Sequence, residues 1–194
     1  MKQTAIINSE IKARCADQES VRQYLREHGA DFTGTDHQID TYFDVPKGRL
    51  KLRQGPIENN LIFYQRADTD GPKQSTINLS PVAPDSTIGE VLTAALGVRV
   101  VVDKQREIYF IDNVKFHIDT VKGLGNFVEI EAIDANGKRN AKELEQQCSH
   151  YMHELGIRAT DLVVGLYSDL LEYGDDIQAT QGPSTLTFFS PVCI

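Results

Sequence analysis

Cysteine is scarce in this sequence of 194 residues. The three cysteines, Cys15, Cys148 and Cys193, are too few and too scattered for a disulfide framework, and none has the spacing of a zinc site. We therefore expect reduced thiols. Long apolar runs are also missing, since none approaches the roughly 18 residues that a membrane helix needs. We expect no membrane-spanning segment.

A secretory signal is missing too, because the N-terminal stretch has neither the apolar core of about 7–15 residues nor a small-residue cleavage site. We expect a cytoplasmic protein. Internal repeats and low-complexity segments are absent, and the length fits one domain rather than two. Residues 173–194 lack sustained periodicity, so we predict one domain over residues 1–172 followed by a flexible C-terminal tail.

Basic residues are outnumbered, with 20 Lys and Arg against 28 Asp and Glu, which gives a net charge of −8. Binders of nucleic-acid polymers usually present a net basic surface, so the balance argues against that class of partner. Net charge does not say where the cations lie along the chain. Their placement is the informative feature.

Gly, Pro and Asp divide the chain into short segments with two kinds of periodicity. Alternation predicts eight strands, over Ile6–Cys15, Gln38–Asp44, Arg49–Arg53, Leu61–Arg66, Ser75–Val82, Val98–Asp112, Val114–Val121 and Phe127–Asp134. Helical spacing predicts helices over Asp17–His28, Asp85–Gly97, Leu144–Leu155 and Leu162–Leu170. The fold class is α+β.

Charged residues recur at every second position of several predicted strands, so each set shares one face. The sets are Glu10, Lys12 and Arg14; Arg49, Lys51 and Arg53; Lys104 and Arg106; and Glu129 and Glu131. One interpretation is that these faces are simply the solvated side of an ordinary antiparallel sheet. For the Lys104 and Arg106 pair, this interpretation remains an alternative. However, some strands present mainly cations and one presents only carboxylates, and this segregation favours a binding site for a charged ligand.

A closed sheet of eight strands would turn these faces inward and leave room for side chains or one small ligand. Buried charges need counter-charges. A polyanion accompanied by divalent metal ions would satisfy both sets, because cations hold phosphate oxygens and carboxylates are hard oxygen ligands.

At these residues the sequence resembles the CYTH superfamily, or triphosphate tunnel metalloenzymes, which includes class IV adenylyl cyclases, thiamine triphosphatases and inorganic triphosphatases. The family's E-x-E-x-K strand motif is matched by Asn8-Ser9-Glu10-Ile11-Lys12, in which Asn8 replaces the first Glu. Further matches, in order, are Gln38–Asp44, Leu50–Arg53, Ile62–Arg66, Gly71–Lys73, Lys104–Arg106, His117–Asp119 and Gly125–Glu131. The likeness covers about Ile6 to Glu172.

The resemblance implies a closed eight-stranded antiparallel β-barrel, a triphosphate tunnel, with flanking helices. It implies triphosphate binding by Lys12, Lys51, Arg53, Arg66, Lys73, Lys104 and Arg106. It implies Mg²⁺ or Mn²⁺ held by Glu10, Asp119, Glu129 and Glu131, and catalytic roles for Glu10, Lys12, Glu129 and Glu131. His117 fits a structural role at least as well as an acid–base role, so it stays outside the catalytic set. Tyr42 and Phe43 fit either barrel packing or contact with a substrate's organic group.

Three functions remain open under this resemblance. We favour hydrolysis of a triphosphate such as tripolyphosphate, thiamine triphosphate or ATP, because hydrolysis needs only water and no ordered nucleoside. The alternatives are a class IV adenylyl cyclase, which forms cyclic AMP and pyrophosphate from ATP, and a non-catalytic triphosphate-binding module. Whether the protein forms a homodimer is not decided by the sequence.

Overall fold

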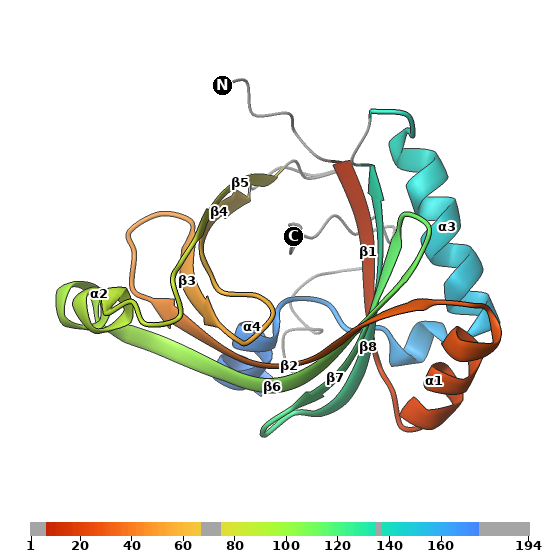
Figure 1. The fold of residues 1–194 in the computed structure, drawn as a ribbon, viewed down its shortest axis with the longest axis horizontal. Helices are drawn as coiled ribbons and strands as arrows, with labels where there is room; N and C mark the ends of the chain where they lie inside the picture. Colours follow the sequence, from red (N-terminus) through yellow and green to blue (C-terminus); the bar gives the residue numbers. More distant parts are fainter. Residues whose placement is uncertain (1–6, 67–74, 135–136, 175–194) are drawn as a thin grey trace.

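The computed structural model describes residues 7–66, 75–134 and 137–174, which form one curved antiparallel sheet with helices around it (Figure 1). The eight strands are β1 (Ile7–Arg14), β2 (Asp31–Phe43), β3 (Arg49–Gln54), β4 (Asn60–Arg66), β5 (Ser75–Pro81), β6 (Val98–Ile111), β7 (Val114–Val121) and β8 (Gly125–Asp134). The predicted number and direction of strands are confirmed.

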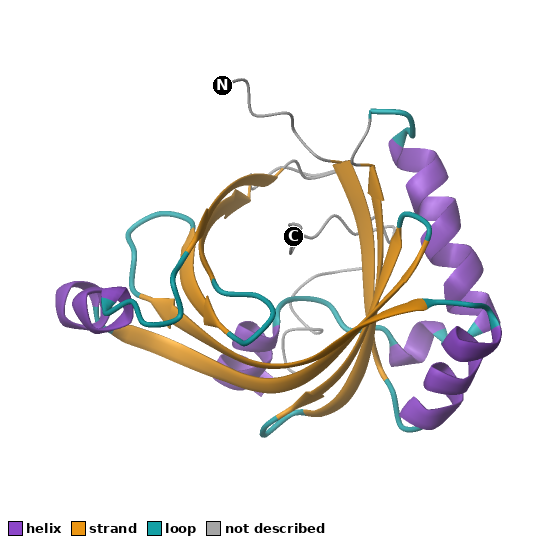
Figure 2. Cartoon of the chain, in the orientation of Figure 1, coloured by secondary structure: helices purple, strands orange, loops and turns teal. Residues whose placement is uncertain are grey.

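The order of strands in the sheet is β1-β8-β7-β6-β2-β3-β4-β5. Figure 2 shows the strands as one curved layer that bends around a common interior. Among the described residues, β1 and β5 form the two edges and no ladder joins them. The predicted barrel is therefore only partly closed, and the sheet is a half-barrel.

The helices are α1 (Gln18–Glu27), α2 (Ile88–Leu96), α3 (Ala141–Glu154) and α4 (Tyr167–Tyr173), and a 3₁₀ turn covers Ala159–Asp161. Asp17 caps α1 as predicted, since its carboxylate accepts a hydrogen bond from the Ser20 amide. Asn140 and Glu143 form a reciprocal capping box at the start of α3. Gly97, with φ of 76°, ends α2 in a conformation that favours glycine.

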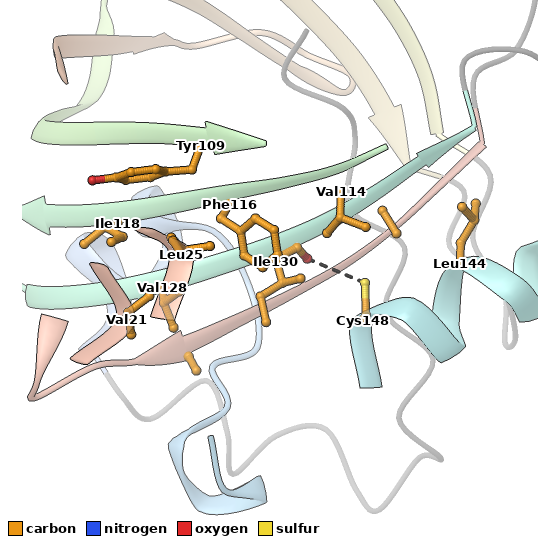
Figure 3. Close-up of a cluster of buried hydrophobic side chains, with 12 residues drawn as sticks. Val21, Leu25, Tyr109, Val114, Phe116, Ile118, Val128, Ile130, Leu144 and Cys148 are labelled. Carbon is orange, nitrogen blue, oxygen red and sulfur yellow. Dashed lines mark hydrogen bonds between the residues drawn. The ribbon is translucent and has the colours of Figure 1, made fainter. Parts of the chain in front are cut away.

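The hydrophobic core lies between the outer face of the half-barrel and helices α1 and α3. Alternation along β7 and β8 turns buried apolar side chains outward, among them Phe116, Ile118 and Ile130. They pack in one cluster with Val21 and Leu25 of α1 and with Leu144 and Cys148 of α3 (Figure 3). Full burial of each large apolar side chain contributes about 1.5–3 kcal/mol. The outer face therefore anchors the sheet, and most of the charged side chains of the strands lie on the concave face.

Two predicted boundaries differ most from the structure, and both are wrong. Strand β2 begins at Asp31 rather than Gln38, because it continues along β6 through a register shift between Phe32 and Gly34 that interrupts the alternation. The last helix begins at Tyr167 rather than Leu162. Leu162 bridges to Ala13, and the Val163 amide donates to the carbonyl of Lys12, so this segment pairs with β1.

Within the described parts of the chain, no helix has both the length and the apolar character needed to cross a membrane. Cys15 and Cys148 form no disulfide. Of the predicted tail, residues 173–194, only Tyr173 and Gly174 are described, and they form the end of α4 and its cap; residues 175–194, with Cys193, lie outside the described residues. The domain boundary at 172 lies within α4.

Candidate functional site

The concave face of the half-barrel holds a cavity walled mainly by charged side chains. Its cations are Lys12, Lys51, Arg53, Lys104 and Arg106, and its carboxylates are Glu10, Asp40, Glu129 and Glu131. The remaining lining residues are Tyr42, Ile62, Tyr64, Val102, His117, Leu166 and Tyr167. The period-2 alternation of the strands places these charges on the face opposite the core.

Asp40, on β2, is the acceptor for three cations from the two neighbouring strands, β3 and β6. Its carboxylate accepts from Lys51 Nζ at 3.1 Å, Arg53 Nε at 2.8 Å and Lys104 Nζ at 3.0 Å. Burial alone would raise the pKa of Asp40, but Arg53, Lys104 and Lys51 together hold it well below its ordinary value. Asp40 therefore stays ionised and keeps the three cations in place.

Asp40 was missing from the predicted site. The signal was present, because Gln38, Asp40 and Tyr42 occupy alternate positions of a matched strand and so share one face. Its partners lie on β3 and β6, and only the order of strands in the sheet shows that these two strands flank β2.

Glu129 is a second acceptor, on the other side of the cavity. Its Oε1 lies 3.0 Å from Lys12 Nζ, and its Oε2 lies 2.8 Å from an Arg106 nitrogen and 3.0 Å from His117 Nδ1. Burial opposes ionisation, yet Lys12 and Arg106 lower the pKa of Glu129 well below its usual range. Burial likewise opposes the charge of Lys12, but Glu129 and Glu10 raise its pKa. These ion pairs keep both groups charged.

Asp119 lies behind the cavity wall rather than in it. Arg106 donates to both of its carboxylate oxygens, and the Tyr167 hydroxyl donates to Oδ2 at 2.8 Å. Asp119 is fully buried and is not among the lining residues. Its geometry is that of a residue that orients Arg106.

His117 contributes no cation at neutral pH. Burial and the nearby Arg106 lower its pKa to about 4, and the hydrogen bond to Glu129 offsets this only in part. The neutral ring therefore donates its Nδ1–H to Glu129.

Glu10 and Glu131 are direct cross-strand partners of β1 and β8, and both line the cavity. The Asn8 amide donates to Glu131 Oε1 at 2.8 Å. Mg²⁺ and Mn²⁺ prefer carboxylate oxygens as ligands, so the chemical type of these donor atoms suits a divalent ion. Over the described residues, however, no three His, Cys, Asp or Glu side chains are already gathered around one metal position.

Two predicted phosphate ligands are not placed. Lys73 lies outside the described residues, and so does the side chain of Arg66, although its backbone belongs to β4. Of the residues predicted to bind triphosphate, the structure brings the other five together in one cavity.

The fold and cavity define a half-barrel protein whose concave face gathers cations beside carboxylates. The CYTH domain model matches residues 7–167. The chain therefore belongs to the CYTH domain family, as the sequence motifs predicted. No protein of curated function matches the chain significantly.

Solved structures show the same fold. The PH1012 protein of Pyrococcus horikoshii is 26% identical, with a TM-score of 0.69 over 84% of this chain and 99% of that one. A Vibrio parahaemolyticus protein, assigned provisionally as an adenylate cyclase, is 16% identical, with a TM-score of 0.68 over 86% and 98%. The Hippeastrum protein HpAC1, proposed as an adenylyl cyclase and described with a dominant triphosphatase activity, is 14% identical, with a TM-score of 0.56 over 87% and 96%.

Proposed function

We propose that the protein is a divalent-metal-dependent hydrolase of an inorganic or organic triphosphate. The observation that supports this best is the cavity itself, in which five buried or nearly buried cations line one space with four carboxylates. Phosphoryl transfer requires mainly positioning and neutralisation of charge, and a row of Lys and Arg supplies both.

In the proposed site the cations gain phosphate oxygens as additional partners when substrate binds. Without substrate, Asp40 holds Lys51, Arg53 and Lys104, and Glu129 holds Lys12 and Arg106. Phosphate oxygens accept hydrogen bonds from the same ammonium and guanidinium groups. Asp40 and Glu129 then keep each cation aimed into the cavity, so little reorganisation accompanies binding.

The proposed ligands of Mg²⁺ or Mn²⁺ are Glu10 and Glu131, with Glu129 beside them, and proteins of the CYTH family generally depend on a divalent metal. The bound ion would polarise phosphate oxygens and lower the pKa of a bound water. Glu129 also holds Lys12, Arg106 and His117. We therefore assign Glu129 a share in orienting these cations, and Asp119 the orientation of Arg106 rather than direct metal contact.

A cyclase that converts ATP to cyclic AMP and pyrophosphate is the alternative. It is favoured by the less polar part of the wall, where Tyr42, Ile62, Tyr64 and Val102 line the same cavity and could contact an organic group. A non-catalytic module that binds triphosphates is the second alternative.

One assay separates the three. Purified protein is incubated with tripolyphosphate, thiamine triphosphate or ATP, each with Mg²⁺, Mn²⁺ or a chelator, and phosphate, pyrophosphate and cyclic AMP are resolved. Metal-dependent release of phosphate is expected. Cyclic AMP would instead establish the cyclase, and tight binding without turnover would establish the binding module.

Lys104 predicts a pH dependence of substrate binding. Burial lowers the pKa of Lys104 to about 8, although Asp40 acts in the opposite direction. Because only the protonated ammonium attracts phosphate, the affinity for tripolyphosphate is expected to fall as pH rises above about 8, by up to roughly tenfold per pH unit. Calorimetric titrations between pH 7 and 9.5 measure this. Lys104→Arg keeps its charge over that range and should flatten the profile; an identical profile in this variant would assign the effect elsewhere.

Asn8 predicts a gain of metal affinity on substitution. Asn8 is buried, and its amide donates to Glu131, so Asn8→Glu exchanges a neutral donor for a third carboxylate besides Glu10 and Glu131. The variant is expected to bind Mn²⁺ roughly tenfold more tightly, because an added anionic oxygen attracts the ion. Without metal it should be less stable, since two carboxylates then repel each other. Metal titration and thermal unfolding with and without Mn²⁺ test this, and unchanged affinity would argue against Glu131 as a ligand.

A further inference from the structure

The loop of residues 55–59, which joins β3 to β4, sends one carboxylate into the interior of the half-barrel. Glu58 is only 8% exposed although it belongs to a loop. Its Oε1 accepts from Lys115 Nζ at 3.0 Å, and its Oε2 accepts from Arg53 Nη1 at 2.7 Å and from Gln38 Nε2 at 3.0 Å. Glu58 is thus held by three strands and is not a solvated loop residue.

Asp36 fixes this loop. Its buried carboxylate accepts from the Ile57 amide at 2.9 Å and from the Glu58 amide at 3.0 Å. A Cβ at Gly55 would meet Asp36 Oδ1 at 2.7 Å, so the loop backbone lies directly against Asp36. The position of the Glu58 carboxylate is therefore set by its own backbone as well as by its ion pairs.

The ion pairs of Glu58 cross the interior. Lys115 belongs to β7 and Arg53 to β3, and β6 and β2 lie between these strands in the sheet (Figure 1). Glu58 therefore spans two strands that do not adjoin. A single anion at this point connects opposite parts of the concave wall.

Glu58 also lies directly beyond the cavity. Arg53 lines the cavity and divides its nitrogens between Asp40 and Glu58, whereas neither Glu58 nor Lys115 is a lining residue. Burial would raise the pKa of Glu58, but Arg53, Lys115, Arg106 and His117 together lower it far below its ordinary value. Three of these groups, Arg53, Arg106 and His117, line the cavity. The row of cations continues past the cavity, and Glu58 occupies its far end.

We propose that Glu58 is a specificity residue that ends the row of phosphate positions and thereby limits the length of the polyphosphate chain that the site accepts. This rests on the proposed triphosphate function. A fourth phosphate that extends toward Lys115 would meet the fixed Glu58 carboxylate, and two anions in one partly desolvated place repel strongly. Removal of that charge leaves Arg53 and Lys115 with one anionic partner fewer, and a longer chain can supply it.

The test compares the affinities of tripolyphosphate and tetrapolyphosphate by calorimetry, at fixed pH and salt. Glu58→Gln keeps the shape of the side chain and removes its charge. This variant is expected to shift the ratio of the two affinities toward tetrapolyphosphate by roughly tenfold, the value of one charge-assisted hydrogen bond. Adding Lys115→Gln to this variant should abolish the shift, because the cation that receives the fourth phosphate is then missing.

Two further variants make the test specific. Glu107→Gln removes the same charge from a part-buried ion pair with Arg22; because Glu107 does not line the cavity, it should leave the ratio unchanged. Gly55→Ala displaces the loop without altering any charge, so it should also shift the ratio of the two affinities toward tetrapolyphosphate. This variant replaces Glu58→Gln in the test if Glu58→Gln does not fold.

The outcomes separate this inference from the proposed function. A wild-type protein that binds no triphosphate would refute the proposed function itself. Wild-type binding of tripolyphosphate with an unchanged ratio in Glu58→Gln or Gly55→Ala would overturn the role of Glu58 alone, and would leave Glu58 as a structural partner of Arg53 and Lys115.

Discussion

Replacing Glu129 and Glu131 together with Gln is expected to lower kcat/KM for the hydrolysed triphosphate by about 10²–10³-fold, the size of effect typical when a preorganised charge contact at the reaction centre is lost. Glu131 is a proposed metal ligand, and Glu129 holds Lys12, Arg106 and His117 in position. The double variant therefore loses both metal affinity and the alignment of two phosphate-binding cations. Steady-state rates measured over a range of Mn²⁺ concentrations provide the test.

The single variants divide the effect. Glu131→Gln should raise the Mn²⁺ concentration needed for half-maximal rate, because it removes one anionic ligand. Glu129→Gln should mainly raise KM, because Lys12 and Arg106 lose their shared acceptor. Glu107→Gln, the same change at an ion pair with Arg22 of α1 outside the cavity, should leave both constants unaltered. Metal-dependent turnover that survives in the double variant would falsify the assignment of the site.

Arg106→Met is expected to be the most destabilising single change in the cavity. Arg106 is 2% exposed and donates to both Asp119 and Glu129, so its removal leaves two buried carboxylates without their shared guanidinium. Loss of one partner from a buried ion pair costs about 3–5 kcal/mol in the free energy of unfolding. Urea unfolding followed by circular dichroism should show a lower midpoint with an unchanged slope.

The destabilisation should depend on pH with a definite sign. In the wild-type protein the pKa of Glu129 is depressed, so the stability that its ionised form contributes is present at neutral pH and is lost as the pH falls through the folded-state pKa. Without Arg106, one of the cations that lower the pKa of Glu129 is missing, so this carboxylate binds a proton more readily. The gap in unfolding free energy between wild type and Arg106→Met should therefore narrow as the pH is lowered from 7 toward 4.

A matched surface change provides the control. Arg158→Met breaks an exposed ion pair with Asp161 and should leave the urea midpoint almost unchanged, because exposed pairs contribute little to stability. Equal midpoints for Arg106→Met and the wild type would show that Asp119 and Glu129 find other partners. That result would contradict the assignment of Asp119 as an orienting residue.

Much of the cavity could be predicted because alternation is a local property. Lys51 and Arg53 share a face whatever the rest of the chain does, and so do Glu129 and Glu131. The same holds for the apolar residues opposite them, such as Phe116 and Ile130, which pack under the helices. The helix cap at Asp17 also depends only on neighbouring residues.

The ends of some elements could not be predicted, because distant contacts override the local pattern. Strand β2 extends back to Asp31 because β6 pairs with Asp31 and Phe32 and, after a register shift that skips Thr33, again from Gly34 onward. Leu162 lies in a helix-like pattern but bridges to Ala13 of β1. In both places, backbone N–H and C=O groups form hydrogen bonds with a strand that is remote in the sequence. The local pattern of apolar residues does not reveal this pairing.

The sequence by itself determined which residues face the interior of the sheet, and through its motifs it determined the family. Only the tertiary structure decided which charges meet. Asp40 holds three cations because β2 lies between β3 and β6, Asp119 lies behind Arg106 rather than in the cavity, and Glu58 enters from a loop. The physical reason is that the direction of a side chain depends on its own strand, whereas its ionic partners depend on long-range strand pairing that no local pattern encodes.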